Sequence, residues 1–244
     1  MPSPKAEFAS LARRLLARLE GSDESEWRLG APVPAEPAPT PASVKPAFDS
    51  LREQVEACRK CPLGGQRLRS VFGVGDPKAK VLFVGEGPGF QEDRQGEPFV
   101  GKAGQLLDKI LASIGLSRQT VYIANIVKCH PMINPADPDA RGNDRPPTPE
   151  EIAACRPYLD SQIHLIAPKV IVTLGSVATK TLLGEDVSIT KVRGLWREYR
   201  VPGDGLTARL LPTFHPAALL RNPELKRDVW TDMKNLKKAL EEEA

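Results

Sequence analysis

The sequence predicts an α/β fold of three layers, in which helices cover both faces of a central, mostly parallel sheet of four strands. Four short and almost continuously apolar runs have the composition of strands buried on both faces, as in parallel sheets. These runs are residues 80–85, 121–127, 170–174 and 209–214. Helical patterns lie between the runs, and alternating strands and helices are typical of a parallel sheet covered on both sides.

The N-terminal part of the chain differs from the rest. Residues 6–20 have the apolar spacing of an amphipathic helix. Residues 31–46 are crowded with prolines, which predicts an extended linker. We therefore expect a flexible N-terminal appendage, 1–45, and a main domain, 46–244. Two roles fit the appendage: it docks a protein partner, or it is a dispensable extension.

Four helices are expected in the main domain. The first covers 103–114, where leucines and isoleucines share one face. The second begins after Thr148, because an N-cap residue, a proline and two glutamates follow one another there. The third is 176–183, which Gly184 ends, and the last is a charged helix from Pro223 to the C-terminus.

Composition limits the function classes. A hydrophobic content of 41% is enough for a buried core. No run of about 18 apolar residues is present, so we expect no membrane span. The absence of a secretory signal pattern favours the cytoplasm of a bacterium or an archaeon. The net charge of +3 permits a polyanionic partner but does not identify one.

The chain has only four cysteines, Cys58, Cys61, Cys129 and Cys155. Four thiolates are the number that completes one iron–sulfur or metal cage. By count alone, a tetrahedral zinc ion fits as well as a cluster. Two disulfides, or unrelated buried thiols, are less favoured alternatives, because no signal peptide indicates an oxidising compartment.

Chemically useful residues follow the predicted strands. In parallel sheets, sites lie at the carboxyl ends of strands. The first strand is followed by GEGPGFQED, 85–93, the second ends near Asn125, and the fourth is followed by His215. The glycines allow a close approach of the backbone to a ligand, but their spacing is neither that of a P-loop nor that of a dinucleotide fingerprint. A second loop with Phe99 at its centre follows within ten residues.

At this point the chain resembles the family-4 uracil-DNA glycosylases, the iron–sulfur class of that superfamily. The resemblance extends over about four fifths of the chain and rests on six segments in the family's order. They are GEGPGFQED, GEPFVGKAGQLLDKIL, VYIANIVKCHP, TPEEIAACRPYL, VIVTLGSVA and TFHPAALLRNPELK. It implies the superfamily's fold and hydrolysis of the N-glycosidic bond of uracil in DNA, leaving an abasic site for base excision repair. It also implies a monofunctional, monomeric enzyme with a [4Fe–4S] cluster on the four cysteines.

The resemblance also gives roles to single residues. Asn125 is expected to read the edge of a flipped-out uracil, and Phe99 to stack on its face. His215 is expected to stabilise the negative charge on the departing base. Each has a structural alternative: a turn asparagine, a core phenylalanine and a capping histidine. The other histidines, His130 and His164, are not expected to be catalytic.

The carboxylate that acts on water or on the sugar cation stays open. Glu86 is the first candidate, and Glu92 and Asp93 are the alternatives. Gly87 belongs to the same uracil-binding loop and stands where better-known uracil glycosylases have an aspartate. Gly89 replaces a bulky residue that other families use to exclude the thymine methyl, and we expect the region of Glu92 to wall that side instead.

The segment after His215 resembles the loop that wedges into the minor groove. Its candidates for contact with DNA are Ala218, Leu219, Leu220 and Arg221. The alternative is an ordinary helix start with buried leucines.

Residues 132–147 form an insertion with the composition of a surface loop. Either it lies beside the DNA, where Arg141 and Arg145 are available, or it is inert. Beside the glycosylase hypothesis stands a second one. It is a non-catalytic nucleic-acid-binding or polymerase-associated domain, stabilised by a cluster or by zinc.

Overall fold

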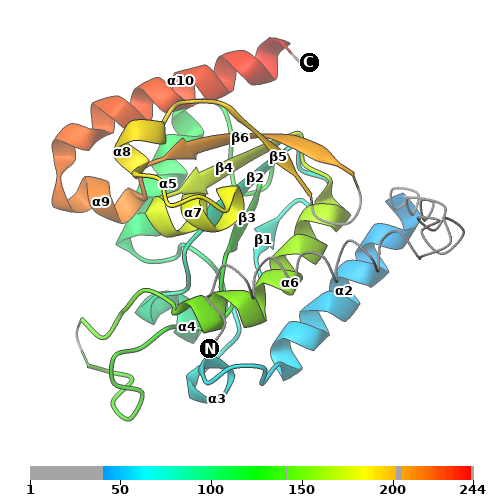
Figure 1. The fold of residues 1–244 in the computed structure, drawn as a ribbon, viewed down its shortest axis with the longest axis vertical. Helices are drawn as coiled ribbons and strands as arrows, with labels where there is room; N and C mark the ends of the chain where they lie inside the picture. The colour runs from blue at the N-terminus through cyan, green and yellow to red at the C-terminus, as the bar shows by residue number, and fades with distance from the viewer. Residues whose placement is uncertain (1–40, 141, 202–204, 243–244) are drawn as a thin grey trace, which may run out of the picture. The chain divides into compact units, whose positions relative to one another are not determined.

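The computed structural model describes residues 41–140, 142–201 and 205–242. The predicted helix 6–20, and with it nearly all of the predicted appendage, lies outside this part of the chain. Six strands form one sheet in the order β1-β3-β2-β4-β6-β5 (Figure 1). Their bounds are Val74–Gly75 for β1, Val81–Gly85 for β2, Tyr122–Asn125 for β3, Val170–Leu174 for β4, Arg197–Arg200 for β5 and Thr207–Thr213 for β6.

The four predicted strands are β2, β3, β4 and β6, and neighbouring strands among them are parallel. The prediction of a four-stranded sheet was wrong in number. β1 pairs antiparallel with β3, and β5 pairs antiparallel with β6, which makes a mixed sheet of six strands. Both additions are edge strands. β1 has two residues, and three of the four residues of β5 are exposed, so neither carries an apolar run.

The helices cover both faces of the sheet, as predicted (Figure 1). One face packs against α2, α6 and α7, and the other against α5, α9 and α10. Side chains alternate along β2, where Leu82 and Val84 belong to the first core and Val81 and Phe83 to the second. The helices are α2 (Pro41–Ala57), α3 (Leu63–Gln66), α4 (Phe90–Gln95), α5 (Lys102–Ser113), α6 (Pro149–Ile166), α7 (Ser176–Leu183), α8 (Ile189–Val192), α9 (Pro216–Arg221), a 3-10 turn (Pro223–Leu225) and α10 (Lys226–Glu242).

The start of α2 corrects the predicted linker. The linker was expected to extend through residue 46, but the helix begins at Pro41 and contains Pro46. Phe48, Leu51 and Val55 follow at helical spacing and are all buried in the first core. Burial of this stripe favours the helix over the extended conformation that prolines alone suggest.

The predicted start of α6 is confirmed in detail. Thr148 accepts a hydrogen bond from the backbone N–H of Glu151, and the Glu151 side chain accepts one from the backbone N–H of Thr148. This reciprocal capping box fixes the first turn. The predicted helix 176–183 also agrees with α7. In the described ranges, no helix has the length and apolar character needed to cross a membrane.

Candidate active site

Gly85 and Asn125 face each other at the carboxyl ends of β2 and β3. A Cβ atom on residue 85 would lie 2.4 Å from Oδ1 of Asn125 and 2.5 Å from Cζ of Phe99. Only glycine therefore permits this packing. The sheet thus brings together the amide and the aromatic ring that the sequence analysis singled out.

Asn125 has an unusual environment for a polar side chain. It is 2% exposed, yet its Oδ1 has no hydrogen-bond partner. Leaving a buried acceptor unpaired costs about 1–3 kcal/mol, so such a group calls for an explanation. An N–H group of a ligand placed beside Phe99 would supply the missing partner.

Phe99 is held in a strained conformation. Its φ of 56° lies in the left-handed region, which costs a non-glycine residue about 1–3 kcal/mol. Arg118 stabilises this conformation by donating hydrogen bonds to the backbone carbonyls of Pro98 and Phe99. Gly104 in α5 is also required, because a Cβ there would lie 1.6 Å from the Phe99 carbonyl oxygen. The surroundings thus fix the ring at the site.

Glu92 connects the two glycine-containing loops. Its Oε1 accepts hydrogen bonds from the backbone N–H groups of Val100 and Gly101, at 2.9 and 3.0 Å. Its Oε2 would lie 3.1 Å from a Cβ atom on Gly89. Glu92 therefore lies beside Gly89, the position where the sequence analysis expected a wall, while it also holds the loop of Phe99 in place.

His215 lies against Phe99, with ring centroids 5.5 Å apart. It is the N-cap residue of α9, and its Nδ1 accepts a hydrogen bond from the backbone N–H of Ala217 at 3.1 Å. The proton of the neutral ring is therefore on Nε2. Burial, assisted by the positive charge of Arg221, lowers the pKa of His215 to about 4. At neutral pH the residue is an uncharged imidazole that can donate from Nε2.

Glu86 and Gly87 directly follow β2 and lie against the segment that follows β3. The backbone carbonyl of Glu86 accepts a hydrogen bond from the Val127 N–H, and a Cβ on Gly87 would lie 2.8 Å from Cγ2 of Val127. The Glu86 side chain is partly buried, and this desolvation raises its pKa. A carboxylate with a raised pKa is a better proton acceptor near neutral pH.

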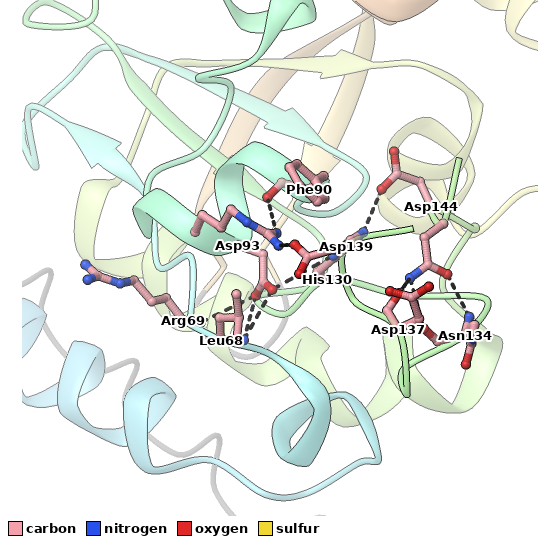
Figure 2. A network of polar contacts seen from close by, with 11 residues as sticks. Leu68, Arg69, Phe90, Asp93, His130, Asn134, Asp137, Asp139 and Asp144 are labelled. Atoms are coloured by element: carbon pink, nitrogen blue, oxygen red, sulfur yellow. Dashed lines mark hydrogen bonds and ion pairs between the residues drawn. The ribbon is translucent and has the colours of Figure 1, made fainter. Parts of the chain in front are cut away.

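Asp93 takes a structural place in the network drawn in Figure 2. Its carboxylate is 0% exposed and accepts hydrogen bonds from the backbone N–H groups of Leu68 and Arg69. His130 is 1% exposed, with Nδ1 4.0 Å from Asp93 and Nε2 2.6 Å from Asp144. Because the Asp93 carboxylate is shielded from solvent, water activation at this residue gains no support from the geometry.

The insertion 132–147 is tied to α4 (Figure 2). Arg94 of α4 pairs with Asp139, and Asp144 pairs with His130. The Asp144 carboxylate would lie 3.7 Å from a Cβ on Gly89. The insertion therefore places beside the candidate site a carboxylate that the sequence analysis did not consider. Arg145, one of the two arginines expected to approach DNA, is already engaged within the protein. Arg145 pairs with Glu151 through two nitrogens. Arg141 lies outside the described residues.

The four cysteines line one cavity between α2, α6 and the segment after β3, together with Arg67 and Tyr158. All four are free thiols, so they form no disulfide. Cys129 Sγ accepts a hydrogen bond from Arg67 at 2.8 Å, and Cys155 Sγ accepts one from the Lys128 backbone N–H at 3.3 Å. Such N–H donors to sulfur stabilise thiolate ligands of a cluster.

The same cavity has thiols that resist ionisation. Burial raises the pKa of Cys129 to about 11 and also raises that of Cys155. A bound cation would therefore have to displace protons from these sulfurs. Within the described ranges, no group of three or more potential ligands is arranged for a single metal ion. The four thiols that line this cavity are the donor set that a four-iron cluster takes, and by count a zinc ion could use the same four.

Comparison with known proteins places this geometry in a family. Residues 72–234 match the model of the uracil DNA glycosylase superfamily. The chain is 45% identical over 200 residues to the type-4 uracil-DNA glycosylase of Thermotoga maritima, a match that covers 80% of this chain and 96% of that protein. It is 43% identical over 196 residues to the type-4 enzyme of Sulfurisphaera tokodaii, covering 78% and 84%. The chain belongs to the type-4 group of the uracil-DNA glycosylase superfamily.

A more distant similarity bears on the second hypothesis. The DNA polymerase of Bacillus phage SP01 is 32% identical over 170 residues, which are 69% of this type-4 family member but only 17% of the polymerase. A domain of this family thus resembles part of a polymerase chain. This chain, in contrast, covers most of the length of the type-4 enzymes that it matches.

In this type-4 family member, the segment after His215 that resembles a minor-groove loop forms α9. Leu219 is 1% exposed and packs in the second core, so in this structure it presents no surface to DNA. Leu220 is 47% exposed, and Arg221 is exposed beside it, whereas Ala218 is partly buried. The helical register therefore turns Leu220 outward and Leu219 inward.

Several residues that shape the pocket or the cysteine cavity were missed by sequence reasoning. Arg118 fixes Phe99, Asp144 approaches Gly89, and Arg67 contacts Cys129. None of them lies in a recognisable motif. Lys128 does lie in a motif, directly before Cys129, but no local pattern indicates that its side chain contacts Gln162.

The neutral state of His215 predicts a pH dependence of stability. In the unfolded chain the imidazole takes a proton below about pH 6.5, whereas the folded protein resists protonation until its pKa of about 4. The neutral imidazole therefore stabilises the folded protein fully above pH 6.5, and this stabilisation is lost as the pH falls toward 4. The total loss of unfolding free energy is up to about 3 kcal/mol. Denaturant unfolding at pH 7 and pH 5 should show a smaller drop for His215→Ala than for the wild type. An equal drop in both would contradict the neutral assignment.

Proposed function

We propose that this chain is a uracil-DNA glycosylase. It hydrolyses the N-glycosidic bond of a flipped-out uracil in DNA and leaves an abasic site for base excision repair. The observation that carries the proposal is the unpaired Oδ1 of Asn125, buried beside the Phe99 ring. A base extruded from the duplex is read on its Watson–Crick edge and stacked on an aromatic ring, which are the two contacts that these residues offer.

Asn125 supports selectivity for uracil. Its amide can accept a hydrogen bond from uracil N3–H through Oδ1 and donate one to O4 through Nδ2. Cytosine presents the opposite pattern, an acceptor at N3 and a donor at N4. A buried amide facing cytosine would keep its polar groups unpaired, which discriminates strongly between the two bases.

The departing uracil carries negative charge, chiefly on O2. A neutral His215 would donate from Nε2–H to this oxygen, and such a donor stabilises charge that develops in the transition state. The sugar becomes positive at the same time. Glu86 is our candidate for orienting water or stabilising that cation, with Gly87 in the same loop. Glu92 is proposed to wall the side of Gly89 and exclude the thymine methyl.

Cys58, Cys61, Cys129 and Cys155 are proposed to hold a [4Fe–4S] cluster. When bound, the cluster supplies a rigid crosslink between the segment after α2, the segment after β3, and α6. Its ligands lie outside the proposed pocket, which favours a structural role over redox chemistry. We propose that the enzyme acts as a monomer, because one chain supplies every group named here, and that it works in the cytoplasm, where the DNA of a bacterium or archaeon lies. Leu220 and Arg221 are the proposed contacts with the DNA groove.

The function is tested by base release from an oligonucleotide that contains one uracil. The wild type should release free uracil and leave an alkali-labile abasic site. His215→Ala should lower the single-turnover rate by about 10²–10³-fold, because one charge-stabilising donor is lost. Affinity for the oligonucleotide should stay unchanged. A wild-type protein with a complete cluster that binds the oligonucleotide but releases no uracil would support the non-catalytic alternative instead.

A further inference from the structure

Lys128 is a lysine that solvent does not reach. It is 1% exposed and lies between the end of β3 and Cys129. Its Nζ donates hydrogen bonds to the backbone carbonyl oxygen of Asn125 at 2.8 Å and to Oε1 of Gln162 at 2.6 Å. Burying an amine is costly unless it is hydrogen-bonded, so these two contacts account for its position.

Gln162 fixes the other side of this contact. It is 0% exposed in α6, and its Nε2 donates a hydrogen bond to the Phe72 carbonyl oxygen at 2.9 Å. Both ends of the amide are therefore engaged, and its orientation is determined. We call Phe72, Gln162, Lys128 and the Asn125 backbone the Lys128 brace.

The brace also adjoins the cysteine cavity. The backbone N–H of Lys128 donates to Cys155 Sγ at 3.3 Å, and the next residue is Cys129. Cys155 and Gln162 belong to the same helix, α6, and their spacing of two helical turns places them on one face. One face of α6 thus contacts both the cysteine cavity and the lysine that holds Asn125.

We propose that Lys128 is a positioning residue for base recognition, which acts by holding the backbone of Asn125 and links that position to the cysteine cavity. The inference rests on the proposed role of Asn125 in reading uracil. An anchored carbonyl fixes the peptide plane and the Cα of Asn125, so only the side-chain torsions remain free. A misplacement of about 1 Å at a reacting centre can lower the rate by about 10²-fold. The accurate placement that this anchor provides therefore outweighs the cost of burying the Lys128 amine.

The test is Lys128→Met, which keeps the length and apolar body of the side chain but removes its donor. The backbone N–H to Cys155 remains, so iron content should be unchanged. The single-turnover rate of uracil release should fall about 10- to 100-fold. The KM for DNA should not change, because contacts with phosphates dominate DNA affinity.

A double-mutant cycle separates positioning from general damage. If Lys128 acts through Asn125, then Lys128→Met added to Asn125→Ala should lower the rate by less than about twofold further. Ile163→Ala is the matched control. Ile163 is buried next to Gln162 in the first core and has no part in the brace, so this variant should lose stability while keeping its rate below the melting temperature.

Two results would overturn the inference. One is an equal rate loss from Lys128→Met in the wild-type and Asn125→Ala backgrounds, and the other is a wild-type rate at full iron content. If Lys128→Met does not fold, Gln162→Met removes the brace from its other side and is judged by the same cycle. A wild type that releases no uracil refutes the proposed function itself. Loss of release in Asn125→Ala but not in the brace variants refutes only the inference.

Discussion

Replacing Asn125 with alanine is expected to lower the single-turnover rate of uracil release by about 10⁴-fold, the lower end of the discrimination set by paired polar groups in a buried site. Both hydrogen bonds to the uracil edge are lost, while Phe99 and His215 stay in place. The measurement is base release with enzyme in excess, together with inhibition by free uracil, which should weaken in parallel. Binding to abasic DNA should be unaffected.

The same substitution should not harm the fold. The Asn125 Oδ1 is buried without a partner, so removing it relieves a cost of about 1 kcal/mol or more, against a small cavity. Asn143 offers a matched contrast. It is buried in the insertion and its amide is fully engaged, accepting from Asn134 N and donating to two carbonyls. Asn143→Ala should therefore lower the melting temperature more than Asn125→Ala. A larger loss of stability at Asn125 would indicate a structural asparagine.

The second large effect is expected at the cysteine cavity. Cys155→Ala should purify with little iron and labile sulfide and without absorbance near 400 nm, because three remaining thiolates do not complete the cage. Binding that exists only in the folded state adds directly to folding free energy. We therefore expect the loss to lower the unfolding free energy by on the order of 5 kcal/mol.

Lys60→Ala is the control for this variant. Lys60 lies between Cys58 and Cys61 and lines the same cavity, but an ammonium is no ligand for iron. This variant should retain iron and melt close to the wild type. A wild type that contains one zinc and no sulfide would replace the cluster with the zinc alternative. If Cys155→Ala loses uracil release only at temperatures where it unfolds, the cluster has a structural role and not a redox role.

Much of the architecture was predictable because its signals are local. β2, β3 and β4 are buried along their whole length and mostly apolar, and the second half of β6 is buried too, since both faces of a parallel sheet are covered. The edge strands β1 and β5 carry no such signal, because one is very short and the other is mostly exposed. The beginning of α2 was missed because prolines dominate the local composition, whereas burial of Phe48 and Val55 decides the outcome.

Leu219 and Leu220 show a similar limit. Two adjacent leucines are equivalent in the sequence, but neighbouring residues of a helix point in different directions. In α9 the first leucine therefore lies in the core and the second at the surface. Helical register relative to a core depends on where the helix is docked. The sequence could therefore indicate the segment but not the residue.

The sequence by itself determined the fold class, the family, the four thiols and the loops at the strand ends, because periodicity, composition and motif order are properties of neighbouring residues. Only the tertiary structure decided how the site is supported. Lys128 meets Gln162 across 34 residues of sequence, and Gln162 meets Phe72 across 90. The unpaired acceptor of Asn125 is likewise visible only when every neighbour is in place. Such contacts arise from packing of distant segments, and no local pattern encodes them.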